Sequence, residues 1–468
     1  MIALLSALIA MAAQGQPPAA QVTPPPNVQP TGPASRAPAD ATGGNGVTLE
    51  QAIQFALQNN PDLRRAELQS QSADQDVTAA RATILPSLSF NASFSDTRNG
   101  GGVVTGTFID QTTVPPRQVT QISPTEVFRG YSATLAVRQL LFDGGKWWNA
   151  LDAADALRAA SDANVDEQRL TTVFNVEQRF YELVRQQRQL KVLGDAALRS
   201  RDQADFTQRL FEGGRATQAD VYAARANRDN DEINRLGQEA RVELARQDLA
   251  IVIGIDPTNP LAIQEPSQMQ QEPAPPPPAG QAVEKALSSR PSLKAFALTA
   301  EGQRKNASAA RGDYWPTIAL NGSYGRQTRD LDTFTSSLNK ASSLSGSINL
   351  TWNLFSGFAT KAAAQKADIA ATLAGVDFAT GRRAVASDVE RAVAQLATTR
   401  QQARIAAQSV QTAGENLRLA RTRQQVGVGT QLEVRDAELK LTQSELARAN
   451  ALVDGHEAES ALRRAVGG

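Results

Sequence analysis

Apolar and polar residues alternate one by one in four short stretches of the chain. Leu88, Phe90 and Phe94, for example, are separated by serine and asparagine. A period of two is typical of a β-strand that has one apolar and one polar face. About ten residues are enough for a tilted strand to cross a bilayer, although the half-buried sheet of a soluble protein has the same alternation. We predict strands at about residues 86–96, 131–142, 316–325 and 344–355.

Long stretches without proline lie between the predicted strands. The two longest, from Lys146 to Glu212 and from Phe358 to Val426, predict helices about 100 Å in length at about 1.5 Å per residue. Shorter helices are expected from Thr217 to Ile253 and from Thr430 to Val466. Their apolar faces are narrow and rich in alanine, which favours either the wall of a hollow tube or an elongated coiled coil.

One short turn occurs twice, each time between a long helix and a shorter one. The segments from Gly214 to Val221 and from Gly427 to Val434 share glycine, threonine, glutamine, an acid and valine at matching positions. Residues before and after the turns are duplicated in the same order. The chain is therefore predicted to contain two tandem repeats, 47–255 and 281–468, each with one helical hairpin and one pair of strands.

Two segments interrupt the repeats. The first copy carries additional residues between about 95 and 130, where Gly100 to Gly102 and Pro115-Pro116 predict a loop. Residues 256–280 join the two copies and contain the run from Pro275 to Pro278. They are predicted to be a linker, partly in polyproline conformation, that lies outside the wall formed by the helices.

The N-terminal segment has the features of a targeting sequence. An apolar run from Met1 to Ala13 ends in small residues and is too short to span a bilayer as a helix, which predicts a signal peptide. No Lys or Arg precedes this run, so a start further upstream stays open. Residues 14–46 are rich in Pro, Gln, Ala and Gly and are expected to form a disordered lead-in. Thr48 and Gln51 then predict a capping box at the first helix.

Composition argues against several classes of protein. Only 5% of the 468 residues are aromatic, which favours long helices over a compact enzyme. Lys plus Arg and Asp plus Glu balance at 48 each, so no charge excess indicates a nucleic acid partner. Without cysteine there is no disulfide or thiolate metal site. The single histidine, His456, is expected to face solvent. No catalytic or metal-binding set of residues is evident in the sequence, so we expect the protein to have no enzyme activity and no cofactor.

All four tryptophans lie at or near junctions between a predicted strand and a long helix. An aromatic belt at one membrane interface has this distribution, whereas a soluble core would scatter the tryptophans. Four strands are too few to close a barrel in lipid, so other subunits would have to complete it. The residues concerned are Trp147, Trp148, Trp315 and Trp352.

The order of these features, over about residues 47–468, resembles the TolC family of outer-membrane factors. The resemblance is carried by the paired turns, by Leu141-Phe142-Asp143-Gly144-Gly145 and by Leu354-Phe355-Ser356-Gly357. It implies a mainly α fold with a membrane β-barrel portion. In a homotrimer, each chain would give four strands to a twelve-stranded β-barrel and four helical staves to a twelve-helix α-barrel. It also implies a location in the outer membrane of a Gram-negative bacterium, with a long periplasmic extension.

The function implied by the resemblance is that of a passive conduit in a tripartite efflux system. The channel would dock a periplasmic adaptor and an inner-membrane pump and export small molecules such as drugs, toxic compounds or metals. A duct for type I protein secretion is the alternative within this class. An exported coiled-coil scaffold or adhesin without a pore is the alternative outside it. The exported substrate and the identity of pump and adaptor stay open.

The resemblance places both turns at the periplasmic tip, where acids narrow the aperture and apolar residues meet the adaptor. Two positions differ from the pattern of some members of the family. Gln424 and Gly429 occupy positions at which those members have a tyrosine and an arginine that belong to the network locking the gate. The gate candidates are Asp220, Glu433 and Asp436, and the adaptor-contacting candidates are Gly214, Arg215, Val426, Gly427 and Val428.

Local chemistry gives some of these residues a second interpretation. Thr217 with Asp220, and Thr430 with Glu433, have the spacing of capping boxes, so these acids are expected to cap helices first. Asp436 lies one turn further in and is the better candidate for a ring of charge in the lumen. Arg138, on the polar face of a predicted strand, either lines the barrel lumen or forms an ion pair near a loop.

Overall fold

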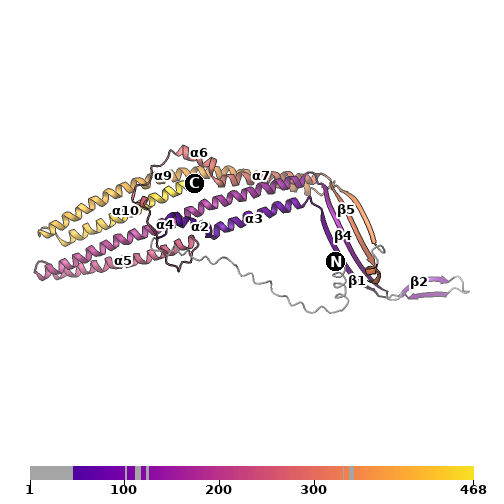
Figure 1. Cartoon of the computed structure of the whole chain (residues 1–468), viewed down its shortest axis with the longest axis horizontal. Helices are drawn as coiled ribbons and strands as arrows, with labels where there is room; N and C mark the ends of the chain where they lie inside the picture. Colours follow the sequence, from indigo (N-terminus) through magenta and orange to yellow (C-terminus); the bar gives the residue numbers. More distant parts are fainter. Residues whose placement is uncertain (1–45, 101–102, 111–116, 123–125, 330, 337–341) are drawn as a thin grey trace. The chain divides into compact units, whose positions relative to one another are not determined.

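The computed structural model describes residues 46–100, 103–110, 117–122, 126–329, 331–336 and 342–468 (Figure 1). The predicted signal peptide, and all of the predicted lead-in except residue 46, lie outside these ranges. The chain divides into two compact units. Of the described residues, 76–153 and 304–368 form what we call the strand unit, and the remainder form the helical unit.

The strand unit contains a four-stranded antiparallel sheet with the order β1-β4-β5-β6. The register aligns Phe90, Leu135, Tyr324 and Leu344 in one row across the sheet. A short helix, α8 (Leu331–Ser336), lies between β5 and β6. The strands are β1 (Ser87–Asn99), β4 (Glu126–Phe142), β5 (Thr317–Thr328) and β6 (Ser342–Thr351).

The segment expected to be a loop between about 95 and 130 is not one throughout, and that prediction was wrong. Its middle contains a hairpin of β2 (Val103–Asp110) and β3 (Arg117–Ile122). Valine, threonine, phenylalanine and isoleucine give these stretches strand propensity. Apolar and polar residues alternate irregularly in these stretches, and glycines and prolines lie nearby in the sequence. For these reasons the sequence pattern predicted a loop instead of strands.

The two faces of the four-stranded sheet differ in chemistry, because successive side chains point to opposite sides. One face carries large apolar side chains, most of which are exposed. So large an exposed apolar face is unlike the surface of a soluble monomer. We call this the apolar face; its residues are Leu88, Phe90, Phe94, Leu135, Val137, Leu320, Tyr324, Leu344, Ile348 and Leu350.

The geometry of the first strand-to-helix junction, between β4 and α4, requires a glycine at position 144. Asp143 accepts a hydrogen bond from the backbone N–H of Trp147 (2.9 Å) at the start of α4. Gly144 has φ +71°, and a Cβ there would lie 2.6 Å from both the Gly312 carbonyl oxygen and the Trp315 Cβ. The junction therefore requires glycine at this position, both for its backbone conformation and for the close approach of Trp315.

The helical unit consists mainly of two hairpins of long helices, and the longer helix of each hairpin begins in the strand unit. Figure 1 shows α5 returning alongside α4, and α10 alongside α9. As predicted, the Thr48 hydroxyl accepts from the Gln51 backbone N–H (3.3 Å), and the Gln51 side chain accepts from the Thr48 N–H (3.0 Å). None of the described helices is both long and apolar enough to cross a bilayer. The helices are α2 (Leu49–Asn59), α3 (Pro61–Ala82), α4 (Lys146–Glu212), α5 (Gln218–Val252), α6 (Ala279–Ser289), α7 (Pro291–Arg311), α9 (Ala359–Gln425) and α10 (Gln431–Val466).

The linker between the repeats packs onto the helices. Leu261 and Met269 are buried in one core cluster with Phe180 of α4 and Leu249 of α5. The Arg188 guanidinium donates a hydrogen bond to the Met269 carbonyl oxygen (2.8 Å). This part of the linker contributes to the core instead of serving only as a spacer.

The expectation that His456 faces solvent was wrong. The side chain is buried, with 8% of the residue exposed, and Nδ1 lies 3.6 Å from the Glu459 carboxylate. Pro273 of the linker crosses directly over Gly455, where an added Cβ would be 2.3 Å from the proline ring. Burial lowers the pKa of His456, because the charged imidazolium loses its hydration.

Candidate functional site at the hairpin turns

The first turn joins α4 to α5 and is fixed by its capping residues. Gly214 has φ +68°, a conformation that favours glycine. The Thr217 hydroxyl accepts from the Asp220 backbone N–H (3.2 Å), and the Asp220 carboxylate accepts from the Thr217 N–H (2.9 Å) and hydroxyl (2.7 Å). The bond from the Thr217 side chain, followed by that from its backbone, lowers the pKa of Asp220. The predicted capping role of Asp220 is confirmed.

The second turn, between α9 and α10, forms only half of the expected capping box. The Thr430 hydroxyl accepts from the Glu433 N–H (3.2 Å). The Glu433 carboxylate lies 3.8 Å from an Arg423 guanidinium nitrogen, on the preceding helix. A Cβ on Gly429 would lie within 3.0 Å of Arg423 and of the Gln424 backbone. Gly429 is therefore required by the tight packing of this turn.

Asp436, the strongest gate candidate from the sequence, is an exposed residue of α10. Its carboxylate is 2.6 Å from the Lys440 ammonium one turn away, and 58% of each side chain is exposed. Surface ion pairs of this kind contribute little to stability. The carboxylate is therefore accessible, but it has a neighbouring cation that the sequence interpretation did not include.

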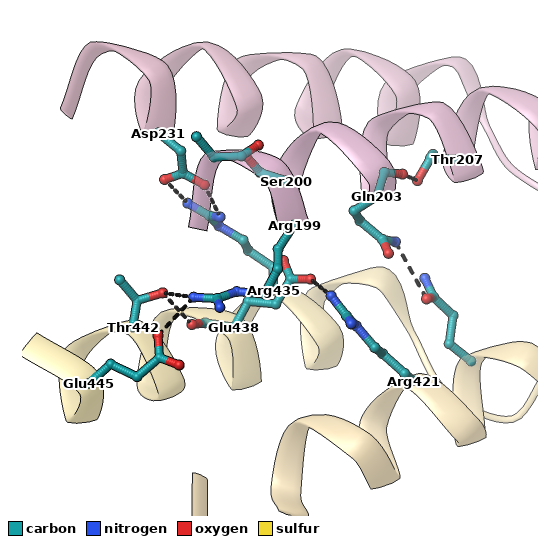
Figure 2. Close-up of polar contacts among 12 residues, drawn as sticks. Arg199, Ser200, Gln203, Thr207, Asp231, Arg421, Arg435, Glu438, Thr442 and Glu445 are labelled. Atoms are coloured by element: carbon teal, nitrogen blue, oxygen red, sulfur yellow. Dashed lines mark hydrogen bonds and ion pairs between the residues drawn. The ribbon is translucent and has the colours of Figure 1, made fainter. Parts of the chain in front are cut away.

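The residue next to Asp436 makes a contact that the sequence did not predict. The Arg435 guanidinium donates two hydrogen bonds to the Asp231 carboxylate (2.7 and 3.1 Å), linking α10 of the second hairpin to α5 of the first (Figure 2). Only 17% of the Arg435 and 11% of the Asp231 side chain is exposed. A bidentate pair of this kind fixes the relative position of two helices more narrowly than a single hydrogen bond does.

Two more arginines surround this pair (Figure 2). Arg199 of α4 donates to the Thr442 hydroxyl (3.0 Å) and to the Glu445 carboxylate (3.1 Å) of α10. Arg421 of α9 donates to Glu438 (2.8 Å), a residue that is only 3% exposed. Burial raises the pKa of Glu438, and Arg421 partly opposes this. The Arg421–Glu438 pair joins α9 to α10 within the second hairpin, and the other contacts join the two hairpins. We call the whole set the inter-hairpin network: Arg199, Asp231, Arg421, Arg435, Glu438, Thr442 and Glu445.

A sequence signal for this network exists in α10. Val434, Ala437 and Leu441 form its buried stripe, and Glu438 occupies a position on the same side. A carboxylate among core positions indicates a buried partner. Gln424, at one of the two departures from the family pattern, also reaches the other hairpin, since Gln203 of α4 donates to its side chain (3.4 Å).

The adaptor-contacting candidates lie at the surface of the turns. The side chains of Val426 and Val428 are exposed, as is Leu432, which the sequence analysis had not singled out. A Cβ added to Gly427 would lie 3.8 Å from an Arg215 guanidinium nitrogen, so Arg215 of the first turn reaches the second turn. The two turns thus form one continuous surface with exposed apolar side chains.

The remaining candidates belong to the strand unit. Trp147 and Trp148 stack at 3.9 Å between ring centroids, and the Trp352 indole donates to the Tyr314 carbonyl oxygen (3.1 Å). Trp148, Trp315 and Trp352 are exposed. Arg138 lies on the face of the sheet opposite to the apolar face, and among the described residues its side chain contacts no carboxylate.

Comparisons with known proteins agree with this architecture. The family model described as outer membrane efflux protein matches residues 52–254 and 282–468. The outer membrane protein TolC of Vibrio cholerae is 24% identical over 90% of this chain and 90% of its own length. The proteases secretion protein PrtF of Dickeya chrysanthemi is 25% identical over 46% of this chain and 43% of its own. A membrane protein of Pseudomonas aeruginosa has a similar fold, with a TM-score of 0.76 and 21% identity over 89% of this chain and 92% of that one.

Proposed function

The chain belongs to the outer membrane efflux protein family, and on that premise we propose that three copies form a passive conduit for small molecules from the periplasm to the exterior. No chemical step on the cargo is part of this function. The observation that carries the proposal is the four-stranded sheet, which has one exposed apolar face and one face rich in serine. Such a sheet suits a wall between lipid and a water-filled lumen.

The trimer follows from the two edges of that sheet. β1 and β6 each pair on one side only within the described chain. Inside a bilayer, each unpaired backbone N–H or C=O group costs roughly several kcal/mol, because no water is present to form the missing hydrogen bond. Pairing β1 of one copy with β6 of the next removes this cost, and three copies give a closed barrel of twelve strands.

Engineered disulfides test this pairing, because the chain has no cysteine of its own. Cysteines placed singly along β1 and combined with Ser345→Cys on β6 should produce covalent trimers at one register. A combination of β1 with β5 is the control, since β4 separates these strands in the sheet. Absence of cross-links at every β1–β6 register would contradict the proposed trimer.

We propose further that the turns dock a periplasmic adaptor and, through it, an inner-membrane pump. Exposed Val426 and Val428 support an apolar contact with the adaptor, at a surface that also includes Gly214, Arg215 and Gly427. Asp436 would form the ring of charge at the aperture, with Glu433 and Asp220 nearby in the turns. The inter-hairpin network would hold the hairpins together around that aperture.

Export of proteins is the second candidate. It is favoured by the relation to the proteases secretion protein of Dickeya chrysanthemi, although that match covers less than half of either chain. Deletion of the gene in its own host separates the two functions. Accumulation of dyes or antibiotics inside the cells supports small-molecule efflux, and loss of a secreted protein from the medium supports the secretion duct.

A further inference from the structure

The second face of the sheet is lined by small hydroxyl and amide side chains. Four successive rows across the strands define what we call the serine face. Cross-strand hydrogen bonds link Ser93 with Ser132 and Ser323 with Ser345, each at 2.8 Å between hydroxyl oxygens. The residues are Ser87, Ser89, Asn91, Ser93, Ser132, Thr134, Ala136, Arg138, Asn321, Ser323, Gly325, Gln327, Ser343, Ser345 and Ser347.

Arg138 is the one charged residue in these four rows, all of which the structure describes. It shares a row with Ser87, Asn321 and Ser347. The same residues line a hollow of about 400 Å³ on this side of the sheet. An arginine with no carboxylate partner, set among hydroxyl groups in a hollow, offers several N–H donors to an incoming anion.

The duplicated strand pair shows that this cation is not required by the fold. The equivalent position in the second copy is Thr351, three residues before Leu354 just as Arg138 lies three residues before Leu141. Thr351 is also exposed and belongs to the same side of the sheet. A charged side chain is therefore not needed at this position for the sheet to form. The Arg138 guanidinium is available to contact a ligand.

We propose that Arg138 and the surrounding serine face form a transit site for anionic groups of the cargo, such as carboxylate, sulfonate or phosphate. This inference rests on the proposed function, because it places the serine face in the lumen. In a trimer, three Arg138 side chains would face one water-filled passage. Their exposure to water keeps binding weak, which suits a passage, since a transported ion must leave as readily as it enters.

Reversal potentials in a gradient of KCl test the proposal with chloride as the probe anion. The parent is Asp436→Asn, which removes the acid proposed for the periplasmic end. A unit charge at about 10 Å in water changes the local concentration of a monovalent ion about twofold. Arg138→Gln should therefore lower the permeability of chloride relative to potassium by about twofold or more at low salt, while Arg138→Lys should retain it.

A second variant controls for the loss of one positive charge. Arg326→Gln removes an arginine from β5 on the opposite face of the sheet and should leave the permeability ratio of the parent unchanged. Equal ratios for Arg138→Gln and its parent would overturn the transit site, as would an Arg326→Gln shift as large as that of Arg138→Gln. A parent protein with no conductance would instead contradict the proposed conduit itself, so the two failures are distinguishable.

Discussion

Arg435 and Asp231 form a bidentate ion pair, at 2.7 and 3.1 Å, between helices of the two different repeats. Both side chains are largely buried, so each carries a desolvation cost that is offset mainly by the partner. Removal of one partner leaves a buried charge uncompensated. The pair therefore keeps α5 and α10 in one relative position.

Asp231→Asn is expected to destabilise the folded protein by about 2–3 kcal/mol, somewhat less than the cost of breaking a fully buried pair. It should also raise the conductance of the resting channel, because α5 and α10 are no longer held together. Denaturant unfolding and single-channel recording measure the two effects. The double variant Asp231→Leu with Arg435→Met should recover most of the stability, since an apolar pair needs no charge compensation. Single and double variants of equal stability would contradict this role.

Glu438 should make the stability of the helical unit depend on pH. Burial raises its pKa above the ordinary value of 4.5 in the folded protein. The stability that such a group contributes is complete below its unfolded pKa and is lost as the pH rises through the folded pKa. The free energy of unfolding of the wild type, relative to Glu438→Gln, should therefore fall as the pH rises above that ordinary value. A difference that grows with pH would mean that Arg421 outweighs burial.

Asp436 is expected to bind cations at the aperture. Asp436→Ala should raise the single-channel conductance or weaken the block by divalent cations, because the ring of negative charge is lost. Lys440→Gln is the matched variant, since it removes the cation 2.6 Å from Asp436 and should strengthen the block. No change in either variant would assign Asp436 and Lys440 to an ordinary surface pair.

Gly429 should be intolerant of even one added carbon. A Cβ there would lie within 3.0 Å of Arg423 and of the Gln424 backbone, so Gly429→Ala is expected to cost about 1–3 kcal/mol. Gly237 lies inside α5 and provides the control, because beyond its chain neighbours and the backbone of its own helix no atom lies within 4 Å of an added Cβ. Gly237→Ala should stabilise the protein by about 0.5–1 kcal/mol. Thermal or denaturant unfolding compares the two, and similar effects from both would contradict the packing argument.

The Thr217 cap should be needed for the first turn. Thr217→Ala removes the acceptor for the Asp220 N–H and is expected to cost about 1 kcal/mol. Thr217→Ser keeps the hydroxyl and should behave as the wild type. The hydrogen bonds from Thr217 lower the pKa of the Asp220 carboxyl in the folded protein. The stability that ionised Asp220 contributes is therefore present above the unfolded pKa of Asp220 and is lost as the pH falls through its folded pKa. The cost of Thr217→Ala should therefore shrink in acid, and a cost that is independent of pH would argue against the box.

Local patterns were enough to predict much of the fold. Alternation across Leu88, Phe90 and Phe94 predicted a strand, and the threonines at positions 48 and 217 predicted helix starts, because these signals need only neighbouring residues. The bounds of α4 agree with the prediction for the same reason, since no proline or cap interrupts Lys146–Glu212.

Contacts between distant segments were beyond such patterns. His456 is buried because Pro273 and the linker cross α10, and no local period of α10 contains that information. The Arg435–Asp231 pair depends on how α5 and α10 are rotated and placed side by side. The sequence interpretation selected Asp436 from its spacing to the turn, whereas its neighbour Arg435 makes the buried contact.

The central claim, that copies of this chain assemble into a conducting channel, is tested most directly by native mass measurement and single-channel recording on one purified sample. The protein should be extracted from the outer membrane fraction in mild detergent and then placed in a planar lipid bilayer. The account predicts a mass of three chains and discrete conductance steps. A monomer of 49.9 kDa that appears in the soluble fraction and produces no conductance would contradict it.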